Sequence, residues 1–241
     1  MKNGLILFLG VFATMVLSWA GVVLAANKQI GTLPQFKDPV DESLNPQPYS
    51  GVANQGRAVY QDLGCATCHT QQIRYGDDGA DIKRGWGERA SYVRDYLRDE
   101  TTHIGQSRLG PDLRNLAKRL PSGAEAEYLY KLLYAPDSKL GGEPLARGMP
   151  AYRFLFEERA ITGNQPSYKA IKLPSSHAAP AGFEIVPTPR AEALVAYLRS
   201  LADTYDYPTE RGLNAPAEVP KEGGKEAPKE GGKEAPKGGG H

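Results

Sequence analysis

Five consecutive residues, Cys65-Ala66-Thr67-Cys68-His69, carry the clearest chemical signature in this chain, and they contain both of its cysteines. A C-x-x-C-H run is the attachment motif of a c-type haem, in which two thiols add to the porphyrin vinyl groups and the adjacent histidine binds the iron. We therefore predict one covalently bound haem c, attached through Cys65 and Cys68, with His69 as the first axial ligand.

Two other roles are known for a C-x-x-C pair, a thioredoxin-like redox centre and half of a zinc site. A redox pair follows a strand in a βαβ pattern, whereas this pair follows a run of residues with helical spacing. A zinc site needs two further ligands, and the sequence has no second cluster of Cys or His. Haem attachment is therefore the favoured interpretation.

The length, composition and net charge of the chain exclude fewer functions than the motif does. The chain has 241 residues, a net charge of +1 and 40% apolar residues, enough for one medium domain with additional segments. Lysines and arginines are spread among acidic residues without a basic block, so we expect no nucleic-acid partner. Haem attachment would use both thiols, so an oxidising compartment is allowed but not required.

Residues 4–26 form an uncharged apolar stretch, long enough as a helix to cross a hydrocarbon layer of roughly 30 Å. The alternative is a cleaved signal peptide, with Val23-Leu24-Ala25 as a possible cleavage site, but the apolar core of a signal is usually about 7–15 residues. A retained transmembrane helix is therefore favoured. The slight charge bias around it predicts the N-terminus inside, with the rest of the chain on the periplasmic side of the cytoplasmic membrane, where bacteria attach c-type haem.

Beyond this span, composition divides the chain into three predicted parts. Residues 27–50 are polar and rich in proline, which predicts an extended linker. Residues 51–207 have apolar residues at helical spacing and few strand signals, which predicts a mainly α domain with long loops, especially at 161–187. Residues 208–241 hold the block KEGGKEAP twice, and this block has no apolar residue larger than alanine, so a disordered tail is expected.

Within the domain, Thr188 and Pro189 give the clearest helix start, as an N-cap and a first helical residue. Gly56 lies inside another expected helix, where glycine costs about 1 kcal/mol relative to alanine. It marks either a weak spot or a place where a second helix, such as the one after Thr188, approaches closely. The expected helices cover residues 51–63, 91–100, 113–119, 124–134 and 189–203.

A second axial ligand can be sought by elimination. Of the three methionines, Met1 starts the chain and Met15 lies in the apolar span, which leaves Met149 in a loop framed by glycine and proline. An isolated methionine can instead be core filler. His103 and His177 are the competing candidates, and an iron left without a second ligand would be open to gas binding.

Helices at both ends of a domain, crossing over a haem edge, resemble the plan of class I cytochromes c. In that family a proline carbonyl after the motif accepts a hydrogen bond from the haem-ligating histidine, and the resemblance implies this role for Pro111 in Leu109-Gly110-Pro111-Asp112-Leu113. From the residues alone, this stretch could equally be an ordinary turn leading into a helix. Arg108 could pair with a haem propionate or remain solvated.

Several stretches in order resemble one family, subunit II of the cbb3-type cytochrome c oxidases, a membrane-anchored monohaem subunit of an oxygen reductase. The resemblance covers most of residues 4–201 and implies Cys65 and Cys68 as attachment sites, His69 as proximal ligand and Met149 as distal ligand. Two features depart from the family pattern, an apparent insertion at 140–148 and Arg74-Tyr75 in place of arginine-proline. The matching stretches lie at 18–21, 56–74, 105–113, 133–139, 149–152 and 182–201.

This resemblance implies that the chain relays single electrons and catalyses no reaction itself. The expected partners are a catalytic haem b and copper subunit, a companion or soluble c-type cytochrome as donor, and the lipid bilayer. Two alternatives remain open, the cytochrome subunit of a nitric oxide reductase and a haem-based sensor. A non-redox interaction protein is the remaining possibility.

Overall fold

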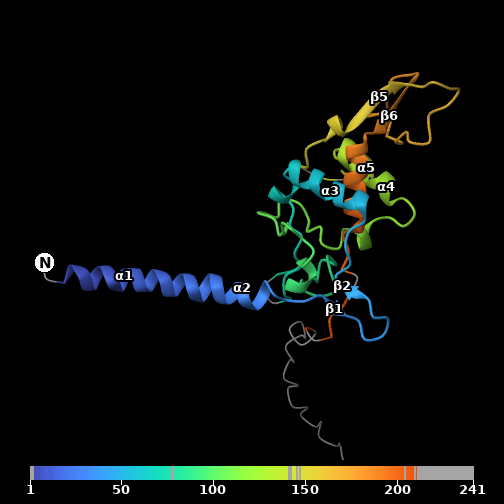
Figure 1. Ribbon diagram of the computed structural model, residues 1–241. Helices are drawn as coiled ribbons and strands as arrows, with labels where there is room; N and C mark the ends of the chain where they lie inside the picture. The colour runs from blue at the N-terminus through green and yellow to red at the C-terminus, as the bar shows by residue number, and fades with distance from the viewer. Residues whose placement is uncertain are drawn as a thin grey trace, which may run out of the picture.

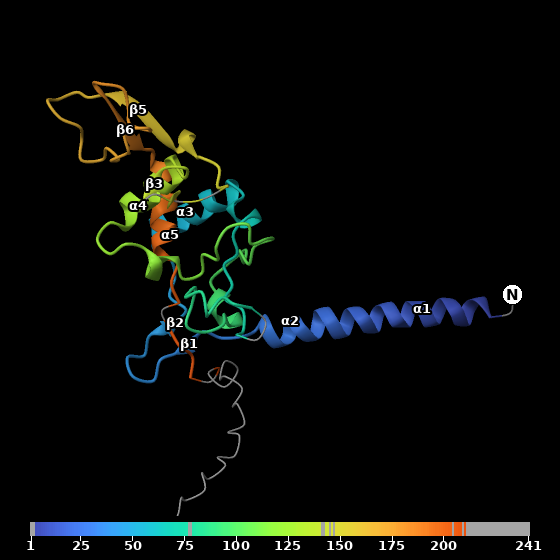
Figure 2. The ribbon, with the colours of Figure 1, turned by 180° about the vertical axis from the view of Figure 1, so that it is seen from behind.

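A long apolar helix stands clear of the rest of the chain in the computed structural model (Figures 1 and 2). It runs without interruption over 27 residues, from Gly4 to Ile30, and none of its most apolar window is buried. At 1.5 Å per residue it is about 40 Å long, enough to cross a bilayer core of roughly 30 Å. The predicted helix at 4–26 is confirmed and extended. It comprises α1 (Gly4–Trp19), a π-helical turn (Ala20–Leu24) and α2 (Ala25–Ile30).

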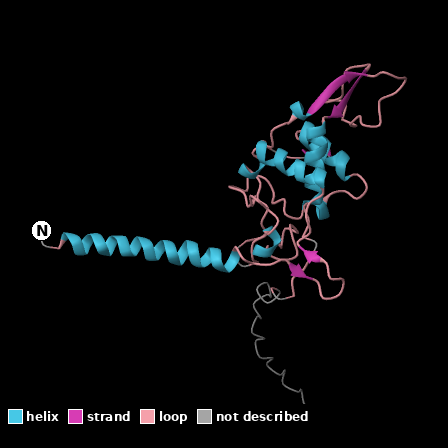
Figure 3. Cartoon of the chain, viewed as in Figure 1, coloured by secondary structure: helices cyan, strands magenta, loops and turns pink. Residues whose placement is uncertain are grey.

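The structure describes residues 3–76, 79–140, 143–144, 146, 148–203, 205–208 and 210. Within this part the longer elements are helices, and the strands are short (Figure 3). The expectation of a mainly helical chain with one apolar N-terminal helix is therefore confirmed. Of the predicted tail at 208–241, all but two residues lie outside the described part.

Two helices far apart in sequence, α3 (Gly51–Asp62) and α5 (Pro189–Ser200), pack against each other at the centre of the domain (Figure 3). Each begins at a hydroxyl N-cap, because the side chains of Ser50 and Thr188 accept hydrogen bonds from the backbone amides three residues later. Pro189 occupies the first turn of α5, where a missing amide proton costs nothing. Both predicted helices are confirmed.

Gly56 lies at the contact between these two helices. A methyl group at this position would overlap the backbone carbonyl of Ala193 and stand 2.8 Å from Cβ of Tyr197. Glycine therefore allows α3 and α5 to approach more closely than any side chain would permit. Of the two interpretations of Gly56, close helix approach is the one observed.

The apolar core forms where α3 and α5 meet α4 (Glu125–Tyr134), which confirms the helix predicted at 124–134. Tyr60 of α3, Leu129 of α4 and Tyr197 of α5 are almost completely buried there. Side chains on the exposed edge of this core include those of the C-x-x-C-H region. The core thus packs against Cys65 and Ala66 of the motif. Its other buried members are Val59, Leu113, Leu133, Leu155, Phe156, Ile185, Ala191, Leu194, Val195, Leu198 and Leu201.

Within the described residues, the strands pair as three antiparallel two-stranded sheets. The largest joins β5 (Phe156–Ala160) to β6 (Phe183–Pro187), with Phe156 opposite Pro187 and Ala160 opposite Phe183. The long loop predicted at 161–187 therefore ends in a strand, which the sequence pattern did not indicate. The two smaller sheets pair β1 (Phe36–Lys37) with β2 (Leu44–Asn45) and β3 (Lys139–Leu140) with β4 (Glu143–Pro144).

Two of the predicted helices are wrong. Instead of a helix at 91–100 the chain forms a single 3-10 turn, Val93–Tyr96, and instead of one at 113–119 it forms the 3-10 turn Leu116–Arg119. The first turn is fixed by the buried carboxylate of Asp95, which accepts hydrogen bonds from the Tyr92 amide at 2.8 Å and from the Arg89 guanidinium. These polar contacts outweigh local helix propensity.

The predicted extended linker, residues 27–50, also differs from the structure. Its first residues continue the apolar helix to Ile30, and its middle forms the β1–β2 pair. Phe36 packs against aromatic rings that follow α5, with a centroid separation of 5.4 Å from Tyr205. The proline-rich segment is therefore packed on the domain, because aromatic partners distant in sequence hold it there.

Substitution of Gly56 tests the close approach of α3 and α5. Gly56→Ala is expected to lower the free energy of unfolding by about 1–3 kcal/mol, the usual cost of overpacking. Gly51→Ala is the matched control, because an added Cβ at Gly51 meets nothing within 4 Å. Denaturant unfolding of the full-length chain in mild detergent gives both values. Equal stability of the two variants would contradict the tight crossing.

Candidate haem site

The C-x-x-C-H motif follows α3 through a tight turn. Gly64 has a φ of 68°, a left-handed conformation that glycine adopts without strain, and it ends the helix. A 3-10 turn, Cys65–Thr67, comes next, and the amides of Cys68 and His69 both donate to the Cys65 carbonyl, at 3.2 and 3.0 Å. The turn therefore brings both thiols and the imidazole into one short loop.

The environment of the thiols argues against a redox pair. Cys65 and Cys68 are not joined by a disulfide, and both are partly buried. Burial raises the pKa of the Cys65 thiol to about 11, so it is protonated at neutral pH. Redox-active cysteines have lowered pKa values, because the thiolate is the reactive form. Within the described part of the chain no three Cys, His, Asp or Glu residues gather as a metal cluster, which also leaves the zinc interpretation without support.

Residues 104–113, here called the proximal loop, lie alongside the motif. Their backbone and side chains satisfy the carbonyl groups that the tight turn leaves without helical partners. The loop thereby fixes the path of the motif. Its hydrogen bonds to the motif run from Gln106 N to Ala66 O (2.8 Å), Ser107 Oγ to Thr67 O (2.5 Å), Gly110 N to Cys68 O (3.0 Å) and Leu113 N to Thr70 O (2.8 Å).

The proximal loop also orients the His69 ring. Nδ1 of His69 lies 2.8 Å from the Pro111 carbonyl oxygen, which can only accept, so Nδ1 carries the proton and Nε2 keeps its lone pair. No hydrogen bond joins Nε2 to the described part of the chain. This is the arrangement that a metal-ligating histidine requires.

Gly110 packs directly against the imidazole of His69. A methyl group there would overlap Cε1 and stand 2.6 Å from Nδ1. Only glycine therefore allows the Pro111 carbonyl to approach the ring from this side. The sequence analysis did not single out Gly110, although its place beside Pro111 was the available signal.

Asp112 connects the proximal loop to the residues that follow the motif. Its carboxylate is fully buried and accepts hydrogen bonds from Thr70 Oγ1 at 2.5 Å, from the Gln72 amide at 2.8 Å and from the Arg114 amide at 2.8 Å. The bonds from Thr70 and Gln72 tie Pro111 more firmly to the segment that follows His69. The sequence pattern did not indicate this role for Asp112.

Arg108 projects toward a second buried carboxylate, that of Asp81. Its Nη1 donates to Asp81 at 2.5 Å and its Nη2 donates to the Gln72 carbonyl at 2.6 Å. Arg74 approaches the same carboxylate at 3.1 Å. The partners observed for Arg108 are the Asp81 carboxylate and the Gln72 carbonyl. Its pairing with a haem propionate stays a prediction.

Met149 packs at the edge of the same apolar core that Cys65 and Ala66 touch, together with Tyr152. The backbone after Met149 is held by a hydrogen bond from the Tyr152 amide to the Leu133 carbonyl, 2.8 Å long. The structure thus places Met149 and the motif on one apolar surface. Its role as iron ligand stays a prediction.

The two competing histidines have other surroundings. His103 is buried, with its ring centroid 5.4 Å from that of Tyr60. Burial and the nearby positive charge of Arg57 lower the pKa of His103, which favours its neutral form. His177 has partners on both nitrogens, Ser176 Oγ at 2.9 Å and Asp137 at 3.2 Å.

The residues present fit a covalently held haem. The two thiols are unpaired, the imidazole is fixed with Nε2 available, and the Met149 side chain packs against the same apolar core as Cys65. The His69 ring occupies the space that a Cβ on residue 110 would fill, and this close packing further restricts the ring to one orientation.

Acid titration tests the buried carboxylate beside Arg108. Burial opposes ionisation of Asp81, but hydrogen bonds from Arg108 and Arg74 outweigh it and lower its pKa from 3.8 to about 2. Its stabilising effect is therefore complete above about pH 4 and is lost as the pH falls toward 2. Thermal unfolding of Asp81→Asn should show a weaker pH dependence in this window than wild type. The control is Asp62→Asn, at an exposed ion pair, and an unchanged slope in Asp81→Asn would contradict the assignment.

Comparison with known proteins places the chain in a family. A family model described as cytochrome C oxidase, mono-heme subunit/FixO matches residues 4–175, which is most of the chain. The match includes the apolar helix, the motif, the proximal loop and Met149, and it ends before β6 and α5. No curated protein matches the sequence. This chain belongs to the family of mono-haem subunits of cytochrome c oxidase.

Proposed function

We propose that this chain is the membrane-anchored electron-transfer subunit of a cbb3-type cytochrome c oxidase and that it carries one covalent haem c. The observation that carries the proposal is the 2.8 Å contact between His69 Nδ1 and the Pro111 carbonyl. It fixes a histidine with a free Nε2 directly beside two unpaired thiols. Membership of a mono-haem family supplies the group that such a site would hold.

In this proposal Cys65 and Cys68 would hold the haem through thioether bonds, and His69 and Met149 would bind its iron. The bound haem would supply reversible one-electron chemistry. His69 is held in one tautomer, because the Pro111 carbonyl accepts a hydrogen bond from its Nδ1–H group. Met149 would close the other side with an uncharged thioether, which favours a raised reduction potential.

The fold supports a class I cytochrome c-like domain. Its N-terminal and C-terminal helices, α3 and α5, cross at a glycine, and the motif follows the first of them directly. Packing of the motif on this helix pair limits movement of the haem-binding residues. A rigid site suits electron transfer because little reorganisation accompanies each transfer.

The proposed partners follow from the family and the apolar helix. Oxygen reduction belongs to a catalytic haem b and copper subunit, and a companion or soluble c-type cytochrome would deliver the electrons. The helix from Gly4 to Ile30 would confine the domain to the membrane and raise its effective concentration near the catalytic subunit and the donor cytochrome. The slight charge bias favours the periplasmic side of the cytoplasmic membrane for the domain.

Absorption spectra of methionine variants test the ligand set. The oxidised wild-type protein is expected to show a methionine-to-iron charge-transfer band, and Met149→Leu is expected to lose it. Met15→Leu is the matched control, because Met15 lies in the exposed apolar helix. Absence of the band from wild type would contradict Met149 as a ligand and would favour a gas-binding sensor.

Substitution of Gly110 tests the proximal side. Gly110→Ala should retain covalent haem but displace the His69 ring from the Pro111 carbonyl, lowering electron-transfer activity roughly 10–100-fold, as is typical when such a supporting contact is lost. Gly163→Ala is the control, since its Cβ would meet only one atom, at 4.0 Å. Unchanged activity and potential in Gly110→Ala would contradict the orienting role.

Purification in mild detergent tests the assembly. The chain should be recovered with a subunit that has many membrane spans and contains haem b and copper, and deletion of the chain should abolish oxidase activity. Recovery with a nitric oxide-reducing subunit would favour the alternative complex. Recovery as a monomer, with full oxidase activity in the deletion strain, would contradict the proposal.

A further inference from the structure

The segment that follows α5 returns along the domain toward the end of α2 (Figures 1 and 2). Its described residues, Asp203, 205–208 and Glu210, are here called the C-terminal strap. Tyr207, near its middle, is only 1% exposed. The strap therefore belongs to the folded structure, although the family match ends well before it.

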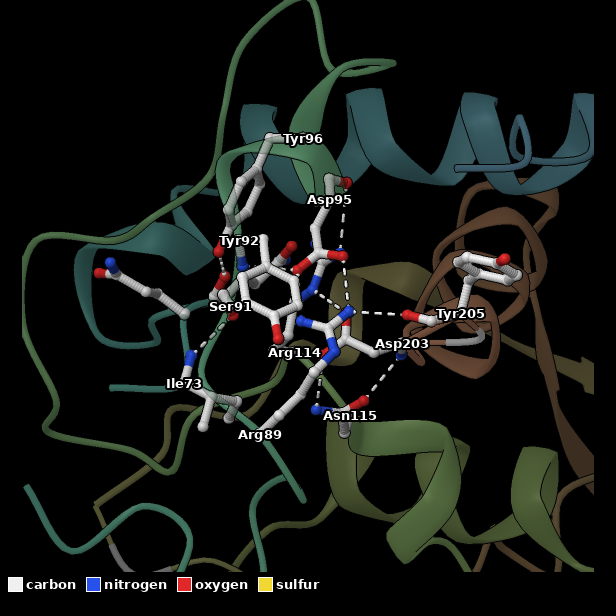
Figure 4. A network of polar contacts seen from close by, with 12 residues as sticks. Ile73, Arg89, Ser91, Tyr92, Asp95, Tyr96, Arg114, Asn115, Asp203 and Tyr205 are labelled. Atoms are coloured by element: carbon white, nitrogen blue, oxygen red, sulfur yellow. Dashed lines mark hydrogen bonds and ion pairs between the residues drawn. The ribbon is translucent and has the colours of Figure 1, made fainter. Parts of the chain in front are cut away.

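One side of the strap is bound to the haem domain through buried charges (Figure 4). Asp203 accepts hydrogen bonds from Arg114 Nε at 2.6 Å and from Asn115 Nδ2 at 3.1 Å, and its amide donates to Asn115 Oδ1 at 2.7 Å. Arg89, which also pairs with Asp95, donates to the Tyr205 carbonyl at 2.9 Å. Arg114 and Asn115 directly follow the proximal loop, so the strap is joined to the part of the domain that holds His69.

The other side of the strap binds the linker. The Phe36 ring lies 5.4 Å from that of Tyr205 and 5.9 Å from that of Tyr207. Arg94 donates both to the Pro34 carbonyl and to Glu210, the latter at 2.7 Å, and its guanidinium lies 5.6 Å from the Tyr207 ring. Linker, domain and strap therefore meet at Tyr207.

This junction shortens the connection between the membrane helix and the domain. The helix ends at Ile30 and the domain begins with α3 at Gly51, so an extended linker between them could reach about 70 Å. With Pro34 held by Arg94, only Gly31, Thr32 and Leu33 lie between the helix and the first anchored residue, a reach of about 10 Å.

We propose that the C-terminal strap, centred on Tyr207, is a positioning element that holds the haem domain at a fixed place relative to the membrane helix. Its consequence for electron delivery rests on the proposed function, whereas the junction itself does not. Loss of the Tyr207 ring would remove an aromatic contact that holds Phe36 and loosen the linker, so that the domain would spend less time at its electron acceptor.

The test compares Tyr207→Ala with Tyr207→Phe in the assembled, detergent-extracted complex. Chymotrypsin cleavage after Phe36, followed by mass spectrometry, should be roughly tenfold or more faster in Tyr207→Ala, because a buried aromatic contact is lost. Tyr207→Phe keeps the ring and should match wild type. Tyr168→Ala is the matched control, since Tyr168 is 93% exposed. Haem content and absorption should be unchanged in all variants.

The second measurement is oxygen uptake supported by a reduced c-type cytochrome, which should fall severalfold in Tyr207→Ala and recover in Tyr207→Phe. Unchanged cleavage after Phe36, equal acceleration in Tyr168→Ala, or faster cleavage with full oxygen uptake would each overturn the positioning role. If Tyr207→Ala fails to assemble, Arg94→Gln replaces it, because this variant loses the contacts to Pro34 and Glu210. The same changes in cleavage and oxygen uptake are then expected, and the same results would overturn the positioning role. Should the chain relay no electrons at all, cleavage would still report on the junction separately.

Discussion

The hydrogen bond between His69 Nδ1 and the Pro111 carbonyl is the contact on which the rest of the site depends. It requires the carbonyl of a residue 42 positions later in the sequence to reach one ring nitrogen. Gly110 makes the approach possible because it has no Cβ, and Asp112 holds the loop in place by bonding the residues after His69. This one hydrogen bond thus leaves Nε2 as the ring nitrogen available to a metal.

Much of the domain between the motif and α4 has little regular secondary structure, and buried charges supply its order instead. Asp81, Asp95 and Asp112 are all buried, and each accepts hydrogen bonds from arginine side chains or backbone amides. Removing one partner of such a pair leaves an uncompensated buried charge, typically at a cost of about 3–5 kcal/mol. The loops are therefore as strongly specified as helices, but by contacts distant in sequence.

Local signals explain which features could be predicted. The apolar stretch, the cap at Thr188 and the spacing of the C-x-x-C-H motif each depend on neighbouring residues, and the corresponding elements are observed. The turn at Asp95 depends on a side-chain pair with Arg89, and the packing of Phe36 depends on Tyr207, which comes from the other end of the chain. Hydrophobic periodicity contains no information about such pairs, so a helix and a free linker were predicted where a turn and a packed segment exist. For the site, the motif pointed to His69 and the resemblance to class I cytochromes c pointed to Pro111, but neither pointed to Gly110 or Asp112.

The structure connects two constraints, a fixed histidine and a short connection to the apolar helix. The proximal loop orients His69, and the residues that directly follow this loop bind the strap that holds the linker. The intact mass of the membrane-extracted protein, with peptide mapping, tests most directly whether a haem is attached to this framework. One haem is expected above the mass of the polypeptide, located on the peptide that contains Cys65 and Cys68. A polypeptide of unmodified mass, with both thiols open to alkylation after denaturation, would contradict covalent haem attachment.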